Sequence, residues 1–163
     1  MNVDRDLERI ALQEKRLVFS HFNAEAAWTI GTALRTEALK RGVSIAIDIQ
    51  LHGHPLFFCA MPGTTPNNIE WIRRKRNLVN RFQRSSYGIG LTILREQSTL
   101  EAKIGGDARD YAAHGGCFPI LLPETGCVGT ITVSGLPQRE DHELVVAVLA
   151  EYLKIPITDI KLD

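Results

Sequence analysis

The chain has 163 residues, 44% of them hydrophobic and 23% charged, which is the composition of an ordinary soluble globular protein and predicts one domain over 1–163. Its 19 basic and 19 acidic side chains give a formal net charge of zero, so we expect no nucleic-acid partner. No apolar run approaches the roughly 20 residues of a membrane span, and the charged N-terminus has no signal-peptide core. Three cysteines without a CxxC spacing indicate reduced thiols, a cytoplasmic protein and no metal site.

Residues 1–22 are expected to form an N-terminal helix and a strand. Apolar side chains follow helical spacing over 3–14, and the sequence RLVFSHF that comes next is typical of a strand. A longer helix is predicted over 24–41. Asn23 is a suitable N-cap for it, and Gly42 suits the left-handed conformation that often ends a helix.

The rest of the chain alternates hairpins with helices. The stretch VSIAIDIQL alternates apolar and polar side chains, and HGHP provides a turn into LFFCAM, so we expect a first β-hairpin here. A helix is predicted over 67–84, and 86–96 is expected to be helix rather than strand. A second hairpin is predicted with strands over 117–122 and 127–134. An amphipathic helix over 144–152 and an apolar tail over 155–163 follow. This order predicts an α/β (α+β) fold with a five-stranded antiparallel sheet and helices packed against it.

The helix predicted over 67–84 contains the most basic stretch of the chain, WIRRKRN. On a helical wheel its arginines fall outside the apolar arc, which is typical of a solvated face, whereas Lys75 falls in the middle of the apolar stripe. A lysine there either extends its ammonium to water or needs a partner, because an unpaired buried charge is costly. We expect Lys75 to be mostly buried, with its ammonium on a carboxylate, a carbonyl oxygen or a ligand. Asp48 and Asp141 are candidate partners.

Two histidine-containing stretches are further candidates for ligand contacts. His52 and His54 flank the glycine of the first hairpin turn, where they could either reach one metal ion or face solvent. His114 precedes Gly115 and Gly116. Adjacent glycines permit a ligand to approach the backbone closely, but they also suit a tight connection, and both interpretations stay open.

Asp141 lies near the start of the last helix, where a carboxylate interacts favourably with the helix dipole and could also contact a ligand. The sequence has no Ser/His/Asp order, Walker loop, GxGxxG or HExxH motif. Catalytic residues are therefore unknown.

The stretches RKRN, HGG-x-x-PI and VSGLPQ-x-x-D together resemble the haem-degrading-domain family of GlcG/HbpS-like proteins, in particular its branch of uncharacterised bacterial and fungal cytoplasmic proteins. The resemblance extends over about 24–150. Met61 and Gly63 stand at the family's distances before the helical lysine. The chain departs from the family pattern at Gln50, where many relatives carry an acid, and at Ala60, where they carry an arginine.

The resemblance implies a three-layer, profilin-like fold with helices on both faces of the sheet, and assembly into homo-oligomers larger than a dimer. It also implies a ligand site at Lys75, His114, Gly115, Gly116 and Asp141. We expect these residues to border one concavity, completed across a subunit interface. The cofactor is unknown. Haem is one possibility, with His114 as the iron ligand.

Two functional hypotheses follow. The first is a cytoplasmic homo-oligomer that binds a small anionic or tetrapyrrole ligand, with haem degradation as its most specific form. The second is an assembly or partner-binding protein without ligand chemistry, in which the apolar tail over 155–163 contributes to subunit contacts or covers a sheet edge. Titration with haem would separate them.

Overall fold

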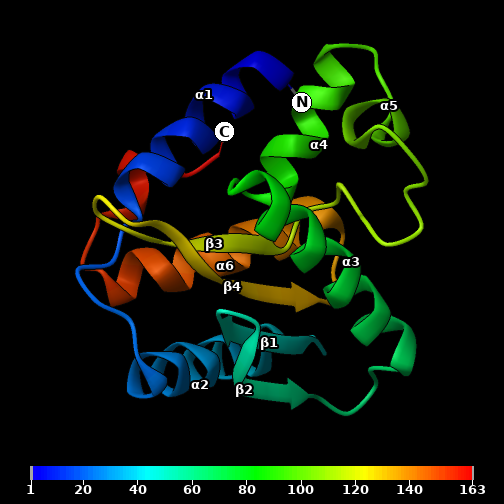
Figure 1. Cartoon of the computed structure of the whole chain (residues 1–163). Helices are drawn as coiled ribbons and strands as arrows, with labels where there is room; N and C mark the ends of the chain where they lie inside the picture. The colour runs from blue at the N-terminus through cyan, green and yellow to red at the C-terminus, as the bar shows by residue number, and fades with distance from the viewer. Residues whose placement is uncertain (1, 163) are drawn as a thin grey trace.

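The chain folds around a four-stranded antiparallel sheet (Figure 1). The structure is a computed structural model that describes residues 2–162. Residues 1 and 163, the ends of the expected domain and of the expected tail, lie outside the described residues. The strands lie in the order β2-β1-β4-β3. Both predicted hairpins are present, and β1 pairs with β4 in the middle of the sheet. The strands are β1 (Ala46–Leu51), β2 (His54–Ala60), β3 (Cys117–Leu122) and β4 (Gly126–Ser134).

The fifth strand predicted from the sequence RLVFSHF does not form. The segment lies beside the edge strand β3, but only one backbone hydrogen bond joins the two, from the Phe19 N–H to the Leu121 carbonyl at 2.9 Å. Leu17 and Phe19 are fully buried in the main core. Packing in the core therefore explains the apolar residues of this segment. The prediction of a five-stranded sheet was wrong.

Six α-helices and one 3₁₀ turn complete the described residues. Asn23 caps the helix predicted over 24–41 by accepting a hydrogen bond from the Ala26 N–H, and Gly42 ends it at φ 66°. The segment around 86–96 is a helix, as expected. The helices are α1 (Val3–Arg16), α2 (Ala24–Arg41), α3 (Pro66–Phe82), α4 (Ser86–Arg95), α5 (Leu100–Ile104), α6 (Gln138–Tyr152) and the turn η1 (Ile157–Asp159).

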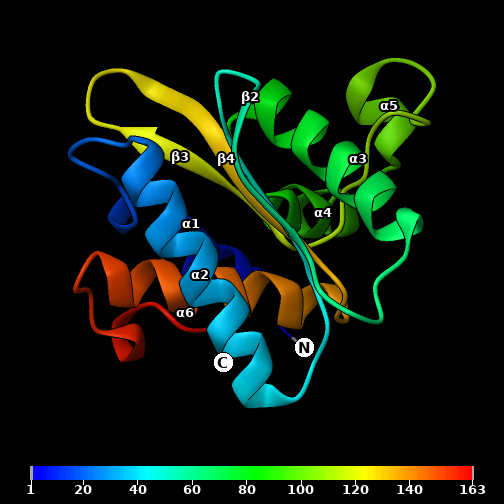
Figure 2. The ribbon, with the colours of Figure 1, turned by 90° about the horizontal axis from the view of Figure 1, so that it is seen from below.

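The helices cover both faces of the sheet (Figure 2). α2 and α6 pack on one face and enclose the main core, which includes Ile30, Leu34, Ile47 and Leu144. α3 packs on the other face, mainly over β4, β3 and β1. The architecture is therefore α+β with helices on both sides of one sheet. No helix within residues 2–162 has the length and apolar character needed to cross a bilayer.

The C-terminal tail packs against its own chain. Ile160 and Leu162 are buried, and the Gln13 and Arg9 side chains of α1 donate hydrogen bonds to the carbonyls of Ile160 and Lys161 at 2.8 Å each. Within the described residues the tail therefore covers α1 rather than a sheet edge.

Candidate functional site

A cleft of about 260 Å³ opens where the N-terminal ends of two helices meet. α3 contributes Asn67, Asn68 and Trp71 to its walls, and the start of α6 contributes Gln138. The loop before β3 adds His114. Because the backbone N–H groups of a first helical turn point out of the helix and carry partial positive charge, two such ends favour a negatively charged ligand.

The floor of the cleft is an ion pair between Lys75 and Asp141. The Lys75 Nζ lies 2.9 Å from the Asp141 Oδ2 and donates a second hydrogen bond to the Val133 carbonyl at 3.1 Å. The two residues are only 3% and 1% exposed. The expectation that Lys75 is buried against a carboxylate is confirmed. The other candidate partner, Asp48, pairs with Arg76 at 2.8 Å instead.

Asp141 is held in place by the loop that precedes α6. The Leu136 N–H donates to its Oδ1 at 3.0 Å, and the Gly135 backbone contributes another hydrogen bond. Burial raises the pKa of Asp141, while the Lys75 ammonium and these N–H groups act in the opposite direction. The stretch VSGLP thus wraps a carboxylate whose negative charge is balanced within the protein.

Gly115 and Gly116 lie behind the ion pair rather than in the cleft wall. Both are buried. A Cβ on Gly116 would lie 2.6 Å from the Val133 carbonyl oxygen and 2.8 Å from the Lys75 Nζ, and its φ of 120° suits only glycine. On Gly115 a Cβ would collide with the Gln138 carbonyl oxygen. The glycines therefore let the loop pack closely against Lys75 and α6.

His114 lies at the rim of the cleft that Lys75 also lines, whereas Gly115 and Gly116, which were expected to border the same concavity, are not among its lining residues. Its ring meets Trp71 edge to face, with 5.0 Å between centroids, and the Arg74 guanidinium lies 5.0 Å from the centroid of the Trp71 ring. Partial burial, together with the Lys75 and Arg74 cations, holds the pKa of His114 below its usual range. At neutral pH the imidazole is therefore neutral and can accept or donate a hydrogen bond.

Arginines on α3 and directly after its end have partners within the chain. Arg73 pairs with Glu70 at 2.6 Å and with Asp110 at 2.9 Å, and Arg84 lies 3.3 Å from Glu14 of α1. The Arg81 guanidinium donates to the Ile104 carbonyl at 2.7 Å. The basic stretch is thus largely used in contacts within the chain.

The two histidines of the first turn, His52 and His54, are exposed. Among residues 2–162, no three His, Cys, Asp or Glu side chains are grouped so that they could hold a metal ion.

Reasoning from the sequence missed half of the residues that line the cleft, namely Asn67, Asn68, Trp71, Ser134 and Gln138. Trp71 belongs to the apolar stripe of α3 and lies one helical turn before Lys75. The two asparagines directly follow Thr65 and Pro66, which begin α3. Polar side chains in the first turn of a helix, about two turns before a lysine that points inward, were the signal in the sequence that could have indicated this wall of the cleft.

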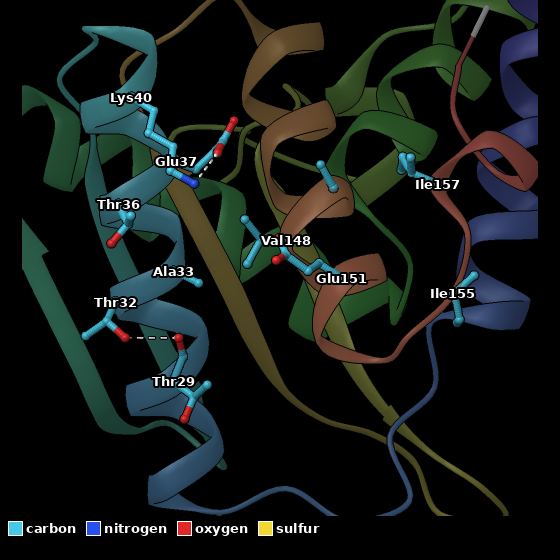
Figure 3. A pocket seen from close by; sticks show the side chains of 11 residues that line it. Thr29, Thr32, Ala33, Thr36, Glu37, Lys40, Val148, Glu151, Ile155 and Ile157 are labelled. Carbon is cyan, nitrogen blue, oxygen red and sulfur yellow. Dashed lines mark hydrogen bonds and ion pairs between the residues drawn. The ribbon is translucent and has the colours of Figure 1, made fainter.

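A larger cavity, about 510 Å³, lies elsewhere, between α2 and α6 (Figure 3). Thr29, Thr32 and Thr36 line one side, and Val148 and Glu151 the other. Its charged side chains, such as Glu151, are at least partly exposed to solvent. Since this groove has no buried charge, the smaller cleft with its ion pair remains the candidate site.

The fold agrees with that of known proteins. Residues 22–150 match the model of the HbpS-like family, described as haem-degrading protein HbpS-like. The chain therefore belongs to the HbpS-like family.

Within that family it is similar to UPF0303 proteins. One from Azotobacter vinelandii is 55% identical over 163 residues, which cover 100% of this chain and 98% of that protein. Another from Rhizobium meliloti is 50% identical over 163 residues, with 100% and 99% covered.

Solved structures share the fold. The Ybr137w protein is 33% identical, covers 91% of this chain and 87% of its own, and superposes with a TM-score of 0.84. A PduOC–haem complex is 16% identical, with 79% and 93% covered and a TM-score of 0.65. The HbpS crystal structure is 20% identical, with 83% and 92% covered and a TM-score of 0.62. The last two show a common fold only.

Proposed function

We propose that the cleft binds a small anionic ligand such as a carboxylate. The observation that carries this proposal is the meeting of the first turns of α3 and α6 over the Lys75–Asp141 pair. Helix N-termini attract anions, and the side-chain amides of Asn67 and Gln138 add hydrogen-bond donors beside them. His114 closes the site as a neutral group that can donate to a carboxylate oxygen.

The dimensions of the cleft favour a small ligand over haem. Its volume of about 260 Å³ lies below the range of about 300–1,000 Å³ for sites that bury drug-sized molecules. A tetrapyrrole is larger than most of those molecules, and His114 is the one imidazole in the wall. The cleft of one chain is thus smaller than a site that encloses a tetrapyrrole, and we assign no haem chemistry to these residues.

Intrinsic fluorescence tests the proposal directly, because the chain has two tryptophans and only Trp71 lines the cleft. In the variant Trp28→Phe, acetate, oxalate and inorganic phosphate are titrated while the emission of Trp71 is followed. We expect a saturable change with at least one of these anions and a weaker affinity after Gln138→Ala. No saturable change with any of them would contradict the proposal.

A parallel titration with haem, followed by absorbance, tests the tetrapyrrole alternative. We expect no tight complex. A Soret band that His114→Ala abolishes would instead support haem ligation, and would mean that the cleft is enlarged in the assembled protein.

A second function, that of an assembly protein, is favoured by the apolar edge of the sheet at β2, where Phe58 is 53% exposed. We propose that the chain acts in the cytoplasm as a homo-oligomer larger than a dimer. Light scattering that gives the 18.2 kDa of one chain at micromolar concentration would contradict this part of the proposal.

A further inference from the structure

The edge strand β2 has unpaired backbone groups along its outer side. The Met61 N–H donates to the Ile45 carbonyl at 3.2 Å, and the register continues through Ile47 with Cys59. Because hydrogen-bonded pairs alternate in an antiparallel ladder, the N–H and C=O groups of Phe58 and Ala60 point away from β1. These groups are free to pair with another strand.

Large apolar side chains flank the same edge. Phe57 packs inward against Gly31 of α2, but Phe58 points to the opposite face and is 53% exposed. Trp28 of α2 is 63% exposed and its ring meets Phe57 edge to face at 5.8 Å. Burying such aromatic surface is a main source of interface stability.

The usual protections of an edge strand are nearly absent from β2. Natural edge strands avoid self-pairing by means of charged side chains, prolines or a covering segment. The whole stretch 49–69 contains no Asp, Glu, Lys or Arg, and Pro55 and the bulge in the pairing with β1 both lie in the first half of β2. Two identical copies can therefore approach through this edge without like charges facing each other.

The opposite edge of the sheet is different. β3 is flanked by the segment of Leu17 and Phe19, which is buried and bonds to Leu121. A head-to-tail contact between β2 and β3 of the next copy would have to displace this segment. Pairing of β2 with itself needs no such change, and an antiparallel arrangement about a two-fold axis is self-complementary.

We propose that β2 pairs with β2 of a second copy, antiparallel and about a two-fold axis near Phe58. The pairing joins two four-stranded sheets into one continuous sheet and buries Phe58 and Trp28 of each copy. This inference rests on the proposed self-association and is independent of ligand binding in the cleft. A larger ring then needs one further contact surface.

The test compares two charge substitutions at equally exposed apolar positions. Phe58→Lys places a charge on the β2 edge, and Leu94→Lys, where the leucine on α4 is 54% exposed, is the matched control. Sedimentation velocity and light scattering give the mass of each protein, and thermal unfolding shows that each is folded. We expect Phe58→Lys to reduce the mass at least twofold, while Leu94→Lys keeps the parent mass.

Hydrogen exchange of the parent protein provides a measurement that needs no variant. The amides of Phe58 and Ala60 should exchange at least tenfold more slowly at assembling concentrations than after dilution to the smallest species. Trp28→Gln, at a second exposed position, should shift the mass in the same direction as Phe58→Lys.

The outcomes distinguish failure of self-association from failure of β2 pairing alone. A monomeric parent protein would overturn both self-association and β2 pairing, and would leave the edge to a different protein. An oligomer whose mass is unchanged by Phe58→Lys, or whose β2 amides remain unprotected, would overturn β2 pairing alone.

Discussion

Lys75 and Arg73 lie two residues apart on α3, and each pairs with a carboxylate in a very different environment. The side chains of the Lys75–Asp141 pair are 4% and 2% exposed, whereas those of the Arg73–Glu70 pair are 37% and 49% exposed. Water screens the outer pair and can replace either partner, but nothing replaces a missing partner in the inner pair. The same helix therefore carries one charge on which the fold depends and another that is nearly dispensable.

The largest effect is expected from Lys75→Met. It leaves the Asp141 carboxylate buried without its counter-ion, which costs about 3–5 kcal/mol of unfolding free energy. Urea denaturation measures the loss.

The double variant Lys75→Met/Asp141→Asn should recover a large part of this stability, because Asn keeps an oxygen for the Leu136 N–H and has no charge. Equal stabilities of the single and double variants would contradict the importance of the pair.

Gly116→Ala is expected to have the next largest effect. At φ 120° the new Cβ meets the Val133 carbonyl oxygen and the Lys75 ammonium, so both backbone strain and the displaced lysine contribute, about 2–3 kcal/mol together. Gly42→Ala is the control, since Gly42 also has a positive φ but its Cβ would meet no atom within 4 Å. Its loss should be about 1–2 kcal/mol.

His142 is a third kind of ionisable group, because it is buried and the fold keeps it neutral. Burial, with a smaller effect of the Arg139 cation, lowers the pKa of His142 to about 3. Its Nε2 lies 2.8 Å from the Gln13 Oε1, and the Gln13 amide nitrogen donates to the Ile160 carbonyl, so Nε2 is the donor. The neutral ring thus already has its partner.

Since the folded pKa of His142 lies below the unfolded one, the unfolded chain binds more protons between these two values. Stability is therefore complete above pH 6.5 and falls as the pH decreases towards 3, by about 1.4 kcal/mol per pH unit from this group. Urea denaturation at pH 7, 6 and 5 measures the slope. His142→Gln should reduce it, and an unchanged slope in this variant would assign the acid sensitivity to other groups.

The sequence predicted the elements best where local signals decide them. Asn23 and Gly42 mark both ends of α2 because capping is a local property of the chain. The position of Lys75 on the apolar stripe likewise predicted its burial. The strand expected around Phe19 was wrong because β-type composition cannot distinguish a strand from a loop that buries the same side chains.

The site was predicted less completely than the fold. Lys75, His114 and Asp141 do meet in one cleft, and the resemblance to the family was what grouped them. The choice of Asp141 over Asp48 depends on which carboxylate the tertiary fold brings to the Lys75 Nζ, and Gln138 reaches the wall only because α6 begins there. Neither fact leaves a local signal in the sequence.

The smallest effect on stability is expected from removing Arg73, whose ion pairs are exposed to solvent. Arg73→Ala removes the pairs with Glu70 and Asp110, but water solvates both carboxylates once the arginine is gone, so the urea midpoint should stay unchanged within error. A local change should still be measurable, because the Arg73 hydrogen bonds hold the pKa of Glu70 below its ordinary value. In Arg73→Ala the pKa of Glu70, followed by NMR, should rise towards that value, and in Lys75→Met it should not move. A large loss of stability in Arg73→Ala would mean that the bond to Asp110 anchors the loop before β3, and that the two charges of α3 are less different than their exposure indicates.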